Sequence, residues 1–238
     1  MVDIHFFGCS LTAGDELIDD EIFPWKKECK DSAEYFKRRV VPADYQERNK
    51  ELAYPALIEN ADINTFNHAA NTAGIQENMI NLIELVSSNK KVDYVYFQIT
   101  PYGREMVINH SDSVASLQLA WDSPGYEDYL KAKRISHKFY QYAIEDFADI
   151  IMVHNYLSNK GIDHKFIELS NWINESRIRD LEHTKFSYLI KEYQKLPILN
   201  LEANISKFPR LLGHHYNKDA HAEISRLITN DLIQNNII

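Results

Sequence analysis

Short apolar runs alternate with longer amphipathic stretches along this chain. The apolar runs are rich in Ile, Val, Phe and Tyr, as in strands that are covered on both faces. The predicted strands span residues 2–8, 63–66, 92–99 and 163–169. Between them, apolar side chains recur every three or four positions, as on one face of a helix. This alternation predicts a parallel sheet with helices on both faces, that is, a three-layer α/β/α domain.

The helix prediction follows the same periodicity, together with start and stop residues. Pro55 suits the first turn of one helix, and Gly161 is a typical stop for another. The predicted helices span residues 32–39, 53–61, 75–88, 127–160 and 218–233, and residues 170–196 are expected to be helical in pieces. Residues 14–54 are expected to form a long connection.

Length and composition are those of one globular domain. The 238 residues suffice for one large domain but are short for two, and 45% hydrophobic with 26% charged residues is ordinary for a globular chain. No repeat or linker-like segment interrupts it. The sequence therefore predicts a single domain over residues 1–238, with insertions at about 20–50 and 106–126.

Charge and cysteine content limit the partners and the compartment. A net charge of −9 opposes nucleic-acid binding, so no nucleic acid partner is expected. No apolar stretch approaches the roughly 20 residues that span a bilayer, so no membrane association is expected either. Asp3 and His5 interrupt the only candidate signal sequence, and two cysteines make no disulfide framework. We expect a cytoplasmic protein; the oligomeric state is left open.

The first strand runs directly into the small residues Gly8-Cys9-Ser10. In an α/β protein, a Ser at this point is exposed at the sheet edge, beside the free backbone N–H groups of a helix start. Ser10 is therefore a candidate nucleophile. The alternative is that Ser10 or Thr12 only caps the following helix.

The stretch GCSLTAG resembles the first motif of the SGNH (GDSL-type) hydrolases. Gly8, Ser10, Thr12 and Gly14 match that motif, and Cys9 stands where Asp is usual. The resemblance implies a flavodoxin-like SGNH hydrolase fold, with Ser10 as the nucleophile and one donor of the oxyanion hole.

Two further motifs of that family have partial counterparts. The loop that ends at Gly74 resembles the second motif, which implies that the Gly74 N–H points into the oxyanion hole. In the third motif Gln98 and Thr100 replace the usual Gly and Asn, and the Thr100 hydroxyl is a shorter substitute donor. A strand ending in Thr with Arg104 close behind resembles divergent phage-encoded members. Arg104 would bind a substrate carboxylate, organise the loop, or form a surface ion pair.

The last motif is found near the end of the chain. His215-Tyr216-Asn217 stands for the family's His-Pro-Asn, which implies that His215 is the catalytic base, with His214 as the alternative register. The triad Asp expected three residues earlier is replaced by Leu212. A backbone carbonyl, a water or an acid from elsewhere would then orient the imidazole, and Glu202 is one candidate.

These residues favour a serine esterase that hydrolyses a short, acetyl-like ester on a small molecule or an acylated glycan, without a cofactor. Adjacent histidines seldom chelate one ion, so no metal site is predicted. A phosphate-binding loop is excluded by the glycine spacing in GCSLTAG. The alternative is a weak or inactive hydrolase-like scaffold that binds a glycan or a protein, because the usual triad Asp and third-motif Asn are absent.

Overall fold

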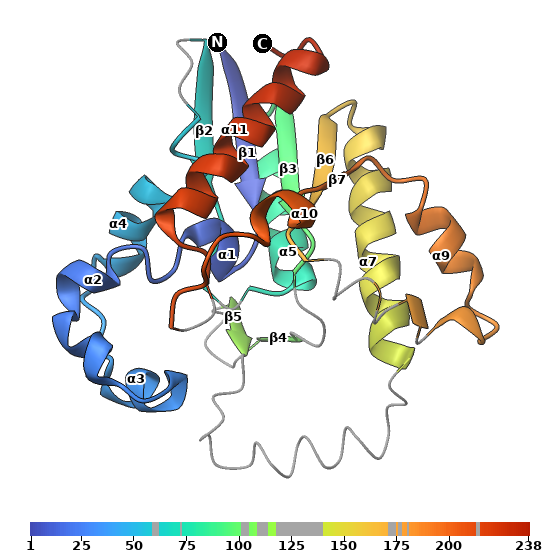
Figure 1. Cartoon of the computed structure of the whole chain (residues 1–238). Coiled ribbons are helices and arrows are strands. Elements are labelled where there is room, and N and C mark those ends of the chain that lie inside the picture. Colours follow the sequence, from blue (N-terminus) through green and yellow to red (C-terminus); the bar gives the residue numbers. More distant parts are fainter. Residues whose placement is uncertain are drawn as a thin grey trace.

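The structure is a computed structural model of the chain, shown in Figure 1. It describes residues 1–58, 62–71, 73–100, 105–108, 114–117, 140–170, 175, 178–179, 181–212 and 215–238.

Five parallel strands form the central sheet, in the order β2-β1-β3-β6-β7. These strands are β1 (Val2–Phe7), β2 (Ile63–Asn67), β3 (Tyr94–Gln98), β6 (Asp163–Glu168) and β7 (Ile198–Asn200). A separate antiparallel pair consists of β4 (Glu105–Ile108) and β5 (Val114–Leu117). Since the five strands of the central sheet are parallel, their carboxyl ends and the loops that follow lie at one edge.

The helices before β2 have at most eight residues, whereas α5, α7 and α11 are the long ones. They are α1 (Ser10–Ala13), α2 (Asp19–Ile22), the 3₁₀ helix η1 (Pro24–Glu28), α3 (Ser32–Arg38), α4 (Tyr45–Leu52), α5 (Ile75–Ser87), α7 (Tyr140–Asn159), α9 (Tyr188–Tyr193), α10 (Glu202–Ile205) and α11 (Lys218–Gln234). Figure 1 shows α11 lying across one face of the sheet.

Alternate side chains of the strands point into two separate cores. On one face, Phe6 and Tyr96 pack with the apolar side of α11. On the other face, Phe7 and Phe97 pack against α5 and α7. Burial on both faces is the reason why these strands are apolar almost without interruption. The fold is thus the predicted three-layer α/β/α arrangement.

The sequence predictions hold for the long elements and fail at several short ones, among them α4 and α10, which were not predicted. A helix over residues 53–61 is wrong: α4 ends at Leu52, and hydrogen-bonded turns follow over residues 53–57. The Ala56 and Leu57 N–H groups there donate to carbonyls three residues earlier, as in turns, and the Tyr54 N–H donates to His221 Nδ1 on α11. Strand β7 was not predicted, since three residues carry too little pattern. Residues 127–139 of the predicted long helix lie outside the described part.

The segment predicted as an insertion at 20–50 forms a small helical unit beside α1 (Figure 1). Its own core contains Phe23, Tyr35 and Tyr45, which pack with Ile18. Of the second predicted insertion, at 106–126, the structure describes only part of β4 and β5. None of the described helices combines the length and apolar character that a bilayer crossing requires.

Candidate active site

The turn after β1 is packed so closely that only glycine fits at its start. A Cβ on Gly8 would lie 2.4 Å from Thr12 Oγ1 and 2.5 Å from Gln98 Oε1. Gln98 Oε1, at the end of β3, accepts from the Cys9 N–H at 3.1 Å and from the Thr12 hydroxyl at 2.6 Å. The end of β3 therefore holds the turn that carries Ser10.

Ser10 is the first residue of α1, and its side chain is not used as a helix cap. The N-cap is Cys9, and the first N–H groups that donate within the helix are those of Thr12 and Ala13, both to the Cys9 carbonyl. The N–H of Ser10 precedes them, at the end of the helix where backbone donors face outward. Gly14 closes the helix in the left-handed conformation, with φ of 77°.

The loop after β2 lies against the same turn. Asn67 Nδ2 donates to the Thr12 carbonyl at 3.1 Å. Asn78 on α5 bridges the two motifs, because its Oδ1 accepts from the Gly8 N–H at 3.1 Å and its Nδ2 donates to the Gly74 carbonyl at 2.7 Å. Gly74 is the N-cap of α5 and is buried. The first two sequence motifs thus meet through a single asparagine.

His215 lies beside an isolated antiparallel β-bridge, which pairs Arg210 with Tyr216, and shortly before the start of α11. Its carbonyl accepts from the Leu211 N–H at 2.8 Å. The buried hydroxyl of Tyr216 donates to the Leu169 carbonyl beyond β6 at 2.6 Å. Asn217 caps α11 by accepting from the Ala220 N–H at 3.0 Å. These contacts fix the backbone on both sides of the imidazole.

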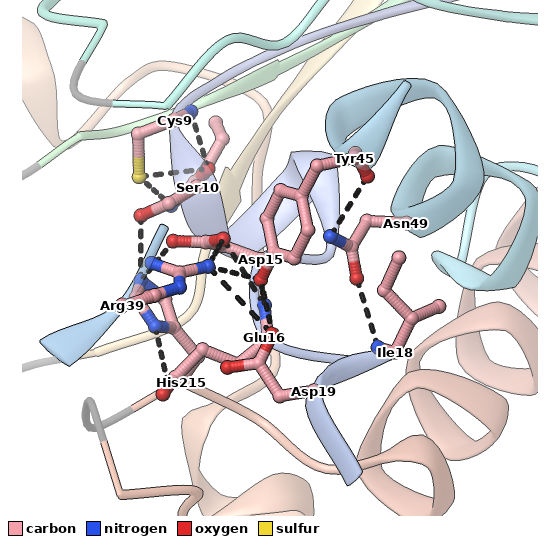
Figure 2. A network of polar contacts seen from close by, with 11 residues as sticks. Cys9, Ser10, Asp15, Glu16, Ile18, Asp19, Arg39, Tyr45, Asn49 and His215 are labelled. Atoms are coloured by element: carbon pink, nitrogen blue, oxygen red, sulfur yellow. Dashed lines mark hydrogen bonds and ion pairs between the residues drawn. The ribbon is translucent and has the colours of Figure 1, made fainter. Parts of the chain in front are cut away.

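Ser10, His215 and Glu16 form a continuous line of hydrogen bonds (Figure 2). His215 Nε2 lies 2.9 Å from Ser10 Oγ, and Nδ1 lies 2.7 Å from Glu16 Oε2. An ionised carboxylate can only accept, so the proton belongs on Nδ1 and Nε2 is left to accept from the serine hydroxyl. The Glu16 side chain is fully buried and that of His215 is 14% exposed. This geometry is that of a nucleophile, a base and an orienting acid.

Glu16 reaches His215 from an unusual backbone conformation. Its φ is 71°, in the left-handed region that costs a non-glycine residue about 1–2 kcal/mol. Its N–H donates to the Tyr45 hydroxyl at 2.9 Å and approaches Asp15 Oδ1 at 3.1 Å. The strain is therefore held by contacts with the neighbouring helical unit.

A second carboxylate, that of Asp15, lies beside the imidazole. Asp15 Oδ2 is 3.8 Å from His215 Nε2, and Oδ1 accepts from Arg39 Nη2 at 2.7 Å. Burial raises the pKa of Asp15, but the charges of His215 and Arg39 outweigh it and hold this pKa below its usual value. Asp15 is therefore ionised at neutral pH.

Behind Asp15, the Arg39 guanidinium also contacts the Tyr45 hydroxyl, which donates to Asp19 Oδ1 at 2.5 Å. Burial raises the pKa of Asp19 above its usual value, because this effect exceeds the lowering by the Tyr45 hydrogen bond and the Arg39 charge. Figure 2 shows this buried polar network next to the line from Ser10 to Glu16. The network supplies fixed charge close to the imidazole in a site that excludes most water.

A cavity of about 210 Å³ adjoins Glu16, between the turn after α1 and the start of α11. Five of its seven lining residues are polar or charged. The lining residues are Glu16, Leu17, Asp20, Leu211, Asn217, Lys218 and Asp219.

The other residues named from the sequence are placed as follows. Thr100 is buried just beyond the end of β3. The preceding residue, Ile99, still pairs with the neighbouring strand, because its N–H donates to the Ile167 carbonyl at 2.9 Å. Glu202 is the first residue of α10, and the carboxylate on His215 Nδ1 is that of Glu16 instead. His214 and Arg104 lie outside the described residues.

Sequence reasoning did not find Glu16, Asp15, Arg39 or Tyr45. The available signal was the pair of acids Asp15-Glu16 directly after the Ser10 motif, a position from which a carboxylate can reach back to the same sheet edge. Among the described residues, no three His, Cys, Asp or Glu side chains are grouped as the ligands of a metal ion would be.

Comparison with solved structures shows which fold this is. No family model matches the sequence, and no curated protein matches it. The psychrotrophic esterase EstA from Pseudoalteromonas sp., in a structure inhibited by monoethylphosphonate, aligns at 10% identity over 98% of both chains, with a TM-score of 0.50. TesA aligns at 10% identity over 97% of both chains, with a TM-score of 0.51.

A carbohydrate esterase family 2 enzyme with a carbohydrate-binding domain, from Corynascus thermopiles (Myceliophthora fergusii), is also similar. It aligns over 98% of this chain and 66% of its own, at 10% identity and a TM-score of 0.54. Together with the sheet order, these alignments show that the chain has the α/β/α fold of these solved proteins, in agreement with the fold class predicted from the sequence.

Proposed function

We propose that this protein is a serine esterase in which Ser10 is the nucleophile, His215 the general base and acid, and Glu16 the orienting acid. The observation that carries the proposal is the line from Ser10 Oγ through His215 to Glu16 Oε2, with separations of 2.9 and 2.7 Å. Both distances are within hydrogen-bond reach, as proton transfer requires.

The reaction follows from this line. Ser10 Oγ bonds to the ester carbonyl carbon while its proton passes to His215 Nε2. The bond to the alcohol oxygen then breaks, and Nε2 returns the proton to that oxygen. Water attacks the acyl-serine in the second half, giving one proton to Nε2, which passes it to Ser10 Oγ as the acid leaves. The buried Glu16 carboxylate stabilises the imidazolium in both halves.

The oxyanion hole is assigned to the N–H groups of Ser10 and Gly74, with the Thr100 hydroxyl beside them. Ser10 N–H lies at the start of α1, and Gly74 is tied to the same turn through Asn78. Thr100 lies at the carboxyl end of β3, next to Gln98, which holds Cys9. Donors fixed in this way are effective because they need no reorganisation as charge develops.

The substrate that we propose is a short acyl ester, acetyl-like, carried by a carbohydrate. The cavity beside Glu16 offers Asp20, Asn217 and Lys218 as hydrogen-bonding groups for a hydroxylated alcohol portion. The similarity in fold to a carbohydrate esterase is consistent with this choice.

The test is hydrolysis of p-nitrophenyl acetate and of acetylated xylo-oligosaccharides by the wild type, Ser10→Ala and His215→Ala. A fluorophosphonate probe followed by peptide mass mapping identifies the reactive serine. Ser88→Ala is the matched control, since the Ser88 hydroxyl only caps α5 by donating to the Leu85 carbonyl. We expect turnover and labelling of Ser10 in the wild type and the control, and neither in the other two variants.

A wild type that neither turns over nor labels would reject the esterase proposal. That result would favour the binding scaffold instead, and equilibrium binding of the same oligosaccharides would then measure it.

A further inference from the structure

Glu16 lies in hydrogen-bonded turns between α1 and α2, not in a helix or strand. Gly14 and Glu16 both have positive φ, at 77° and 71°. The turns have backbone hydrogen bonds of their own, from the Leu17 N–H to the Gly14 carbonyl at 3.2 Å and from the Asp19 N–H to the Glu16 carbonyl at 3.1 Å. The direction of the Glu16 side chain depends on the backbone angles, and contacts from outside the turn help to fix them.

Tyr45 on α4 supplies the first of these contacts. Its hydroxyl accepts from the Glu16 N–H at 2.9 Å and from Arg39 Nη2, and donates to Asp19 Oδ1 at 2.5 Å. A hydroxyl has one proton and two lone pairs, so all its hydrogen-bonding capacity is used here. The ring is only 2% exposed and packs against Phe23, with ring centroids 6.4 Å apart.

Asn49, one helical turn further along α4, supplies the second contact. Its Oδ1 accepts from the Ile18 N–H at 3.1 Å, and its Nδ2 donates to the Tyr45 carbonyl at 3.0 Å. The side chain is 1% exposed. One helix thus binds the backbone at Glu16 and again two residues later, through the side chains of Tyr45 and Asn49, and the second of these also donates to the backbone carbonyl of Tyr45 (Figure 2).

We propose that Tyr45 and Asn49 are positioning residues for the Glu16 carboxylate, and that α4 serves the active site through them. The inference rests on the proposed function, since it gives a catalytic consequence to the Glu16–His215 contact. The segment of residues 20–50 then has the role of keeping the Glu16 carboxylate on His215.

The experiment compares Tyr45→Phe and Asn49→Ala with the wild type, using p-nitrophenyl acetate. The matched control is Tyr35→Phe: Tyr35 belongs to the same buried aromatic cluster, but its hydroxyl has no hydrogen-bond partner among the described residues. We expect kcat to fall roughly tenfold to a hundredfold in both test variants, with KM nearly unchanged, because misplacement of a catalytic group acts on the transition state. The control should stay within about twofold of wild type.

A second readout separates positioning from loss of stability. When Tyr45→Phe moves Glu16 away from the imidazole, the acidic limb of the pH profile of kcat/KM should shift to lower pH, because a nearby carboxylate favours the charged imidazole. In a Glu16→Gln background the same substitution should change kcat by less than about twofold, since the group it positions is already lost.

Equal losses of kcat in the presence and absence of Glu16 would overturn the inference, and so would wild-type kcat in Tyr45→Phe and Asn49→Ala. If circular dichroism shows that Tyr45→Phe does not fold, the kcat of Asn49→Ala alone tests the inference. Failure of the esterase proposal looks different: the wild type itself would then show no turnover and no labelling of Ser10.

Discussion

Glu16 Oε2 and His215 Nδ1 lie 2.7 Å apart although 199 positions separate the two residues. The acid beside the histidine therefore comes from the segment that carries Ser10. Ser10 opens α1 and Glu16 lies in the turn that follows it, whereas the imidazole comes from near the other end of the chain. The Asp15 carboxylate from the same turn adds further negative charge at 3.8 Å from Nε2.

Replacing the acid should slow the chemical step. We expect Glu16→Gln to lower kcat by roughly a hundredfold or more, because the amide neither stabilises the imidazolium nor enforces the tautomer. Steady-state hydrolysis of p-nitrophenyl acetate measures the effect. Glu192→Gln, an exposed carboxylate on α9, is the control and should be unchanged. Full activity of Glu16→Gln would show that another group orients His215.

Removing the Asp15 charge should destabilise the fold. In Asp15→Asn the buried Arg39 guanidinium loses the shorter of its two ion pairs, whose side chains are 9% and 7% exposed, and keeps the longer one to Asp19 at 3.7 Å. Breaking a buried pair costs about 3 kcal/mol. Urea titration measures the free energy of unfolding. The exposed pair of Glu223 and Arg226 is the control: Glu223→Gln should change this free energy by less than about 1 kcal/mol. Equal effects of the two substitutions would contradict the buried ion pair.

Stability should fall as the pH drops from about 6.5 towards 4. Burial lowers the pKa of His68 to about 4 and that of His221 to about 3. Between the ordinary value near 6.5 and these values the unfolded chain binds more protons than the folded one, so acid favours unfolding. At His221 the proton would also displace the Tyr54 N–H from Nδ1. Urea midpoints at pH 7 and pH 4.5 measure the difference.

His68→Asn should reduce the difference between the two urea midpoints, because the folded state then has one fewer histidine with a lowered pKa. A midpoint that rises on acidification would contradict the assignment of neutral, buried histidines.

The close approach at Gly8 should make this position intolerant of any side chain. In Gly8→Ala the new Cβ meets Thr12 Oγ1 and Gln98 Oε1, so we expect a loss of about 1–3 kcal/mol and of fluorophosphonate labelling. Gly161→Ala is the matched control, because its φ of 68° strains a side chain but no atom lies within 4 Å. It should cost about 1 kcal/mol and leave labelling intact. Normal labelling of a folded Gly8→Ala would contradict the tight turn.

Local patterns were enough to predict four of the five strands of the central sheet and its long helices α5, α7 and α11. The strands β1, β3 and β6 are covered on both faces, so consecutive side chains in them are apolar. A run of consecutive apolar residues can be recognised from the sequence alone. The helix expected over residues 53–61 failed: residues 53–57 form turns instead, and the Tyr54 N–H there binds His221 on α11, a partner that a local window does not include. The single-domain organisation of residues 1–238 stays a prediction.

The sequence by itself determined where the serine turn and the histidine segment begin, since Gly8, Ser10, Asn217 and the start of α11 follow short-range rules of turns and caps. Only the tertiary structure decided which acid faces the imidazole. Glu16 reaches His215 because Tyr45 and Asn49 hold a left-handed turn in place, and a conformation maintained by distant side chains leaves no periodic signal in the chain.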